Sequence, residues 1–332
     1  MGVNSTENGV FDLIVIGGGP AGLAATTTAL NAGLHVALVT PDLGGKVGYP
    51  FQLSDQPPVD SVWGADLVHQ FESFVEANLD DHLKTTVQNV SRLNNGHFQV
   101  ALVGNNKPIN GRTVLVATGA KPQLLHVPGE QELWMRGLSY SALSHAPFFD
   151  GRDALVVGRG GRALVAALQL ATLANRVYLA PTLALKDSPL VKQIRKNPNI
   201  TLFEGWKLQR IVGTDFVEQA ELVRDYTTEV LTIDGVFIEL GLIPNQEFVR
   251  DLVKFDAETG RIPINQRCET SVPGLFAAGD VTNIYAEQVP VAIGEGTKAA
   301  LSAWEYLAVH YAQERPHHTT PRTERRLLQH GP

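Results

Sequence analysis

Two glycine-rich turns, about 140 residues apart, constrain this chain more than any other feature. The first spans residues 17–22 (GGGPAG) and the second spans residues 158–163 (GRGGRA). Each follows a short apolar run and opens a run of small residues, which predicts a strand, a tight turn and a helix. In such a unit the glycine backbone and the helix N-terminus bind a dinucleotide pyrophosphate. The sequence therefore predicts an α/β chain with two Rossmann-like dinucleotide-binding domains.

Composition narrows the function classes. The chain has 332 residues, of which 44% are hydrophobic and 18% charged, enough apolar material for two folded domains. The net charge of −7 gives no basic surface for nucleic acid. We expect neither a membrane span nor a secretory signal, and hence a cytoplasmic protein. The one cysteine, Cys268, forms no internal disulfide, and no residue cluster predicts a metal site.

The first turn follows the apolar run 11–16 (FDLIVI). Its first glycine permits the sharp turn, its second lets the backbone approach a pyrophosphate, and its third lets helix and strand pack closely. The residues predicted to bind there are Gly17, Gly19, Pro20, Ala21 and Gly22. The next strand, 35–39 (HVALV), does not end in the expected ribose-binding acid. Asp42, Thr40 or backbone groups remain as alternatives for that contact.

The second turn follows the apolar run 154–157 (ALVV) and precedes a second small-residue helix. The residues predicted to form this second nucleotide site are Gly158, Arg159, Gly160, Arg162 and Ala163. The two arginines either add positive charge near a pyrophosphate or lie in solvent. The strand that follows, 176–179 (RVYL), leads into Ala180 and Pro181 without an acid for a ribose.

Three further blocks extend this pattern: 113–122 (TVLVATGAKP), 237–245 (FIELGLIPN) and 274–280 (GLFAAGD). With GGGPAG at the front, and in this order, they resemble the flavoproteins with two dinucleotide-binding domains. Given the chain length, the resemblance is to the low-molecular-weight thioredoxin reductases, over roughly residues 10–310. It implies a discontinuous FAD-binding domain, 1–121 and 242–312, and an inserted NADPH-like domain, 122–241. The tail 313–332, rich in arginine, histidine and proline, is predicted to be mobile.

The resemblance also implies which residues contact FAD. Gly45 and Lys46 match the segment beside the flavin, and the Ala117-Thr118-Gly119 run closes over the nucleotide. Asp280, after Gly279, is expected to bond the ribityl chain or the phosphate region. The family positions that open a helix aimed at the flavin ring are Gln288 and Val289. Such a helix dipole would stabilise an anionic reduced ring.

The second site departs from the family pattern. NADP-selective relatives carry a His-Arg-Arg run after the second strand, where this chain has Leu179-Ala180-Pro181. Three alternatives stay open: NAD(P)H bound through other contacts, a structural relic, or a different dinucleotide such as a second FAD.

The family's Cys-x-x-Cys is replaced by residues 141–144 (SALS). Ser141 and Ser144 keep the spacing of the dithiol, but serine has no accessible thiolate and forms no disulfide. Natural loss and a paired Cys→Ser replacement both remain open, and both fit serines that simply cap a helix. His145 stands where relatives often have an acid, so it is a candidate acid or base near neutral pH.

The sequence thus predicts an FAD-dependent oxidoreductase of thioredoxin-reductase type, from a disulfide-reductase lineage but without its dithiol. One alternative is a flavoenzyme similar to the ferredoxin–NADP reductases of this fold. Another is a non-catalytic flavin-binding sensor or scaffold. The resemblance implies a homodimer and a thioredoxin-like or ferredoxin-like redox partner, while the electron donor and acceptor stay open.

Overall fold

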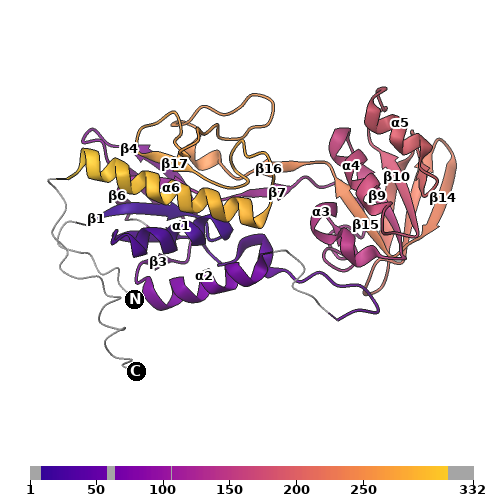
Figure 1. Cartoon of the computed structure of the whole chain (residues 1–332), viewed down its shortest axis with the longest axis horizontal. Coiled ribbons are helices and arrows are strands. Elements are labelled where there is room, and N and C mark those ends of the chain that lie inside the picture. Colours follow the sequence, from indigo (N-terminus) through magenta and orange to yellow (C-terminus); the bar gives the residue numbers. More distant parts are fainter. Residues whose placement is uncertain (1–8, 58–63, 106, 313–332) are drawn as a thin grey trace. The chain divides into compact units, whose positions relative to one another are not determined.

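The structure, a computed structural model, describes residues 9–57, 64–105 and 107–312 (Figure 1). The chain forms two compact units. Unit 1 comprises Met1–Gly48, Gly64–Ala120 and Pro244–Pro332, and unit 2 comprises Tyr49–Trp63 and Lys121–Ile243. Each unit contains a largely parallel sheet covered by helices, so the predicted α/β class with two Rossmann-like domains is confirmed. The predicted tail 313–332 lies outside the described residues.

The sheet of unit 1 has the strand order β3–β2–β1–β6–β5–β4, and β17 pairs with β6. Its strands are β1 (Val10–Ile16), β2 (Val36–Val39), β3 (His82–Leu83), β4 (Val87–Arg92), β5 (Phe98–Leu102), β6 (Ile109–Val116) and β17 (Leu275–Ala277). The β4–β5 and β5–β6 pairings are antiparallel, and the other pairings are parallel. β5 pairs with the first half of β6 and β17 with the second half, so β17 completes the carboxyl edge. Open parallel sheets bind ligands at that edge.

Both faces of this sheet are buried, as the apolar run of β1 predicts. Leu13 and Val15 lie in one core cluster, under the helices, and Ile14 and Ile16 lie in the cluster on the opposite face. The helices of unit 1 are α1 (Pro20–Asn31), α2 (Ala65–Asn78) and α6 (Val289–His310), with 3-10 turns η1 (Gly45–Gly48) and η3 (Glu247–Val249).

Helix α6 runs alongside α1 over the sheet (Figure 1). The two helices approach so closely that a Cβ atom on Gly296 would lie 2.0 Å from the carbonyl oxygen of Ala21. Because Ala21 belongs to the first glycine turn and to the first turn of α1, this close contact holds the N-terminal part of α6 beside that turn.

Unit 2 has a parallel sheet in the order β11–β10–β9–β15–β8 and a separate antiparallel sheet, β12–β13–β14. The parallel strands are β8 (Leu138–Ser139), β9 (Asp153–Gly158), β10 (Arg176–Pro181), β11 (Ile200–Leu202) and β15 (Gly235–Glu239). The antiparallel strands are β12 (Lys207–Val212), β13 (Gln219–Arg224) and β14 (Thr227–Thr232). The helices are α3 (Ala142–His145), α4 (Gly160–Leu170) and α5 (Pro189–Lys196), with a 3-10 turn η2 (Ala146–Phe149).

The segment Tyr49–Trp63 groups with unit 2, whereas the sequence prediction counted it with the first domain. Phe51 and Leu53 are 1% exposed and belong to the same core cluster as Phe149 and Val156. The burial of these two side chains in this cluster explains why the segment groups with unit 2. The sequence around them has no helix or strand pattern, so it did not indicate which domain they join.

Besides the two crossings at the ends of the segment Tyr49–Trp63, the chain passes between the units through β7 (Ala120–Pro122) and β16 (Leu242–Pro244), which pair as a two-stranded sheet. The amide of Gln123 donates to the carbonyl of Gly241 at 3.0 Å, and the amide of Asn245 donates to that of Gly119 at 3.0 Å. Among the helices of residues 9–57, 64–105 and 107–312, none combines the length and apolarity that crossing a bilayer requires.

Candidate dinucleotide sites

The first glycine turn is packed so tightly that it excludes side chains. Gly17 has a φ of 110°, and its amide donates to the carbonyl of Val39 at 2.9 Å. A Cβ atom on Gly17 would lie 2.4 Å from the Ala117 carbonyl oxygen, and one on Gly22 would lie 1.8 Å from that of Gly17. At Gly19, by contrast, no atom lies within 4 Å of the Cβ position. This cradle, closed toward the protein and open at Gly19, fits a pyrophosphate on the backbone.

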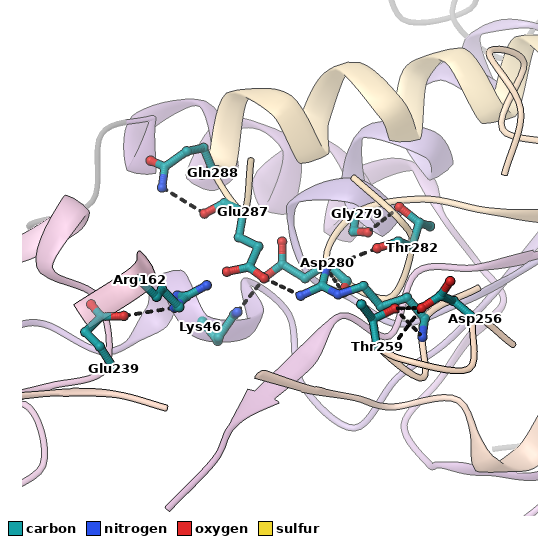
Figure 2. A network of polar contacts seen from close by, with 11 residues as sticks. Lys46, Arg162, Glu239, Asp256, Thr259, Gly279, Asp280, Thr282, Glu287 and Gln288 are labelled. Carbon is teal, nitrogen blue, oxygen red and sulfur yellow. Dashed lines mark hydrogen bonds and ion pairs between the residues drawn. The ribbon is translucent and has the colours of Figure 1, made fainter. Parts of the chain in front are cut away.

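Two distant segments of unit 1 flank this turn. A Cβ atom on Gly45 would lie 3.0 Å from the Cα of Gly19, and one on Gly279 would lie 3.1 Å from a side-chain atom at the start of α1. From these segments, Lys46 Nζ and Asp280 Oδ2 meet at 2.5 Å, although they are 234 residues apart (Figure 2). The structure thus brings the predicted Lys46 and Asp280 together at the turn, one suited to phosphate and the other to hydroxyl groups.

Glu295 of α6 holds the turn that carries Asp280. Its Oε2 accepts hydrogen bonds from the Gly279 amide at 2.9 Å and from the Thr282 hydroxyl at 3.3 Å. Arg261 Nη1 donates to the carbonyl oxygens of Asp280 at 3.1 Å and Thr282 at 3.0 Å. Burial raises the pKa of Glu295. Sequence reasoning missed Glu295 and Arg261, and the one signal for the former was a glutamate between two glycines in residues 294–296.

The predicted helix start at residues 288 and 289 is confirmed. Gln288 is extended, with φ −130° and ψ 146°, and α6 begins at Val289 with Pro290 in its first turn. The Gln288 side chain donates to the Glu287 carbonyl at 2.8 Å (Figure 2). Among the described residues the first turn of α6 carries no acidic side chain, so its N-terminal amides keep a positive potential.

The run 117–119 closes onto the FIELGLIPN block. Thr118 Oγ1 donates to the Asn245 carbonyl at 2.5 Å, and Asn245 Nδ2 donates back to the Thr118 carbonyl at 3.1 Å. Gly119 has a φ of 63°, where a larger residue would be strained. The Thr118 hydroxyl therefore acts within unit 1, and Asn245, which sequence reasoning did not single out, positions this run.

The ribose contact had three alternatives. Thr40 is 5% exposed, and its hydroxyl donates to the Asp42 carbonyl at 2.7 Å. That same carbonyl lies 2.5 Å from the Cβ position of Gly18, so the segment abuts the glycine turn. The Asp42 side chain is exposed at this edge, which favours its carboxylate over the Thr40 hydroxyl as a ribose partner.

The second glycine turn repeats the closed-and-open pattern. A Cβ atom on Gly158 would lie 2.4 Å from the Glu239 carbonyl oxygen. The Cβ positions of Gly160, whose φ is 62°, and of Gly161 have no atom within 4 Å. Ala163, in the third small position, is buried at the start of α4. This backbone also fits a dinucleotide pyrophosphate.

Both arginines of the second turn bind groups of unit 2 rather than lying free in solvent. Arg162 Nε donates to Glu239 Oε2 at 2.9 Å (Figure 2). Arg159 Nε donates to the Leu240 carbonyl at 3.1 Å, and its Nη2 donates to Gln123 Oε1 at 2.6 Å. The Glu239 side chain, which sequence reasoning missed, is only 4% exposed.

The end of β10 offers no charged side chain to a nucleotide, since residues 179–185 read LAPTLAL. Thr182 is the polar exception, but its amide and its hydroxyl donate to the Gly158 carbonyl at 2.8 and 3.2 Å. Leu183 is 63% exposed. Neither a 2′-phosphate nor a ribose diol meets a charged partner in this stretch.

The two serines at the expected dithiol positions are neighbours. Ser141 Oγ and Ser144 Oγ lie 3.0 Å apart. Ser141 is the N-cap of α3, and its Oγ accepts the Ser144 amide at 3.3 Å. The capping interpretation therefore holds for Ser141, whereas Ser144 lies within α3 and donates its amide to that cap.

His145 is buried at 5% exposure, against the expectation of an acid or base near neutral pH. Its Nδ1 lies 2.6 Å from Ser139 Oγ, and its ring stacks on Phe51 with centroids 4.4 Å apart. Its Nε2 is buried with no hydrogen-bond partner among the described residues. Burial lowers the pKa of His145 to about 4, so the ring is neutral at pH 7 and a weak base.

Cys268 packs as a small apolar residue in the core of unit 1, as predicted. Its Sγ lies 3.5 Å from the Glu295 carbonyl oxygen. Burial raises the pKa of the Cys268 thiol to about 11. At neutral pH it is therefore protonated and unreactive.

Comparison with known proteins places these two sites in a family. Residues 11–296 match the sequence profile of the family described as pyridine nucleotide-disulphide oxidoreductase. The chain is 32% identical over 308 residues to NADH dehydrogenase of Bacillus subtilis, covering 90% of this chain and 58% of that protein. It is 30% identical over 303 residues to one of the subunits of alkyl hydroperoxide reductase from Staphylococcus epidermidis, covering 90% and 59%. The chain thus spans less than two thirds of these curated relatives.

Among solved structures, thioredoxin reductase from Streptococcus pyogenes matches with a TM-score of 0.81 and 28% identity. The match covers 91% of this chain and 100% of that one. The likeness therefore includes both units, with their two glycine cradles. The chain belongs to the pyridine nucleotide-disulphide oxidoreductase family, as a thioredoxin-reductase-like FAD flavoprotein.

Proposed function

We propose that this chain is an FAD-dependent oxidoreductase that transfers electrons without a dithiol of its own. The observation that carries this proposal is the pair of serine hydroxyls, Ser141 and Ser144, 3.0 Å apart at the dithiol positions. A hydroxyl neither ionises at neutral pH nor forms a disulfide. Cys268, the one cysteine of the sequence, is buried with a pKa of about 11 and does not replace them.

FAD supplies hydride and single-electron chemistry when bound, and unit 1 has the residues to hold it. Supporting residues are those of the first cradle and its flanks: Gly17, Gly19, Pro20, Ala21, Gly22, Asp42, Gly45, Lys46, Ala117, Thr118, Gly119, Gly279, Asp280, Gln288 and Val289. Lys46 contributes a cation for phosphate oxygens. Asp280 contributes a carboxylate for sugar or ribityl hydroxyls, and Glu295 fixes the backbone that presents it.

We assign to unit 2 a second dinucleotide that lacks a 2′-phosphate. The cradle of Gly158, Gly160 and Ala163 supports a pyrophosphate, and Arg159 and Arg162 stand at its rim. The uncharged end of β10 favours NADH or a second FAD over NADPH. The name of the Bacillus subtilis relative, NADH dehydrogenase, makes NADH the first donor to test.

The acceptor follows from the missing dithiol. A thioredoxin-like partner needs thiol–disulfide exchange, whereas a ferredoxin-like partner exchanges single electrons and needs no thiol. The two serines therefore favour a ferredoxin-like acceptor as the second candidate function.

We further propose a homodimer, because α6 exposes Val291, Leu301 and Val309 at 39%, 49% and 75%. Light scattering of the purified protein tests this, and a monomeric mass at micromolar concentration would contradict it.

The decisive experiment counts flavins and then supplies donors. We expect released FAD at one or two per chain, and faster flavin bleaching by NADH than by NADPH. A flavin that none of NADH, NADPH or reduced ferredoxin bleaches would support the sensor or scaffold alternative instead. A preparation that stays transparent near 450 nm after incubation with excess FAD would overturn the proposal.

A second experiment tests the dithiol positions. The unchanged protein should not reduce thioredoxin or a small aromatic disulfide. The double variant Ser141→Cys/Ser144→Cys should form a disulfide, because the Oγ atoms are already 3.0 Å apart. Both proteins are compared in a Cys268→Ser background so that no other thiol contributes. Disulfide reduction by the unchanged protein would contradict the proposal.

A further inference from the structure

Glu239, the last residue of β15, joins the starts of two helices of unit 2. Its Oε1 accepts a hydrogen bond from the Ala142 amide at 2.8 Å, and its Oε2 accepts one from Arg162 Nε at 2.9 Å. Ala142 is the first residue of α3, the helix that carries the two serines, and Arg162 lies in the first turn of α4. One carboxylate therefore connects the second glycine turn to the serine helix.

The burial of this carboxylate makes its ion pair with Arg162 energetically important. Glu239 is 3% exposed, and a charge removed from water needs an opposite charge close by. The Arg162 guanidinium meets that need, whereas the Ala142 amide supplies a hydrogen bond but no net charge. If Arg162 turned away, the carboxylate would gain by turning toward water, and the Ala142 amide would lose its acceptor.

Arg162 is placed to turn away. Its side chain is 38% exposed, and it directly follows Gly160 and Gly161, whose Cβ positions are open. A guanidinium binds phosphate oxygens in a two-pronged geometry, as it does a carboxylate. A diphosphate seated on this turn therefore competes with Glu239 for the same group.

We propose that Glu239 is a positioning residue that couples occupancy of the second nucleotide turn to the order of the serine helix α3. The coupling rests on the proposed second site. A dinucleotide diphosphate draws Arg162 from Glu239, and the start of α3 loosens around Ser141 and Ser144. By linkage, an ordered α3 opposes nucleotide binding by the same factor. A change that orders or disorders α3 therefore changes the affinity of the second glycine turn for the dinucleotide.

Hydrogen–deuterium exchange of residues 139–149 in the FAD-loaded full chain tests the coupling without any added ligand. Arg162→Met removes the guanidinium that pairs with the buried carboxylate at 2.9 Å, so the Ala142 amide should exchange at least about tenfold faster. Glu239→Gln keeps an acceptor for Ala142 without the charge, so exchange should stay near that of the unchanged protein. The double variant Arg162→Met/Glu239→Gln should also stay near it. Arg159→Met, the matched control, should leave this segment unaffected.

The comparison of the single variants with the double variant is decisive. If Arg162 had a merely structural role, Arg162→Met would accelerate amide exchange equally with Gln and with Glu at position 239. That result, or no acceleration in Arg162→Met, would overturn the inference. Exchange of β9 amides in the same samples shows whether unit 2 is still folded.

Adding ADP-ribose, which carries the diphosphate without a 2′-phosphate, tests the coupling to the ligand. Exchange of residues 139–149 should rise in the unchanged protein and not in Glu239→Gln. Measurable ADP-ribose binding with no change in exchange would overturn the coupling and leave the second site standing. No binding would overturn the second site itself, while the variant cycle still decides the role of Glu239.

Discussion

The two glycine turns are alike in sequence, but they differ in how closely the protein packs against them and in which charged groups lie beside them. In the first turn a Cβ atom at Gly22 would collide with the Gly17 carbonyl oxygen at 1.8 Å, whereas the second turn carries Ala163 at that position. The first is flanked by the Lys46–Asp280 pair, drawn from two distant segments. The second uses its own arginines, which are held by neighbouring groups of unit 2. The first turn is thus closed by its own backbone and flanked by an ion pair from elsewhere in unit 1, whereas the arginines of the second turn are bonded to neighbouring groups of unit 2.

The largest effect should come from exchanging the third small residue of the turns. Gly22→Ala places a methyl group 1.8 Å from a backbone oxygen that cannot move aside cheaply. We expect loss of bound FAD and a drop of about 3 kcal/mol in the free energy of unfolding of unit 1. The flavin absorbance of the purified variant and its thermal unfolding are the measurements.

Ala163→Gly is the matched exchange in the second turn. It removes a methyl group from a helix start, and the cost should be about 1 kcal/mol. Equal losses in both variants would mean that the two turns are equally tight, contrary to the comparison.

The second effect is a difference between the units in how their stability depends on pH. His145, in unit 2, has a pKa lowered to about 4 by burial, so the folded ring stays neutral while the unfolded ring takes up a proton near pH 6.5. Its stabilisation is therefore complete above pH 6.5 and is lost as the pH falls toward 4. The loss reaches about 3 kcal/mol over that window. Denaturant unfolding of a Trp304→Phe background, in which the remaining tryptophans belong to unit 2, measures it by fluorescence.

His145→Phe should remove this pH dependence while keeping the ring contact with Phe51. His82 in unit 1 also has a lowered pKa, with burial as the main cause, but it is only partly buried and its Nε2 donates to the Thr40 carbonyl at 3.3 Å. We therefore expect a shallower slope for unit 1. An unchanged slope in His145→Phe would assign the effect to other groups.

The difference between the turns also shows what the sequence could reveal. The strand–turn–helix units were predictable, because each depends on residues a few positions apart. The start of α6 at Val289 followed from the family resemblance. Glu239 and Glu295 were missed. Their partners, Ala142 and Gly279, lie 97 and 16 positions away, and only the folded sheet edge brings them together. The local sequence pattern thus located the two glycine turns, whereas the side chains beside them, such as Glu239 and Glu295, are placed by contacts between distant parts of the chain.

The two ion pairs give the third effect. Arg162→Met removes the guanidinium that lies 2.9 Å from Glu239, whose side chain is 4% exposed, and should cost unit 2 about 2 kcal/mol. Lys46→Met leaves Asp280, whose side chain is 13% exposed, without a lysine that is itself 54% exposed. That pair should be worth less than about 1 kcal/mol to unit 1. Thermal unfolding of both variants without added nucleotide measures the contrast, and a larger loss from Lys46→Met would reverse it.

The smallest effect concerns nucleotide choice in the second turn. Thr182→Arg places a cation at the end of β10, where the stretch 179–185 has none. We expect the affinity for NADPH relative to NADH to rise about tenfold, or ~1.4 kcal/mol, measured by titration of the FAD-loaded protein. The Thr182 amide can still donate to the Gly158 carbonyl, so the turn should keep its shape. Thr182→Met, which loses the same hydroxyl but adds no charge, is the control. Equal preference in both variants would place the ribose away from β10 and break the parallel between the two cradles.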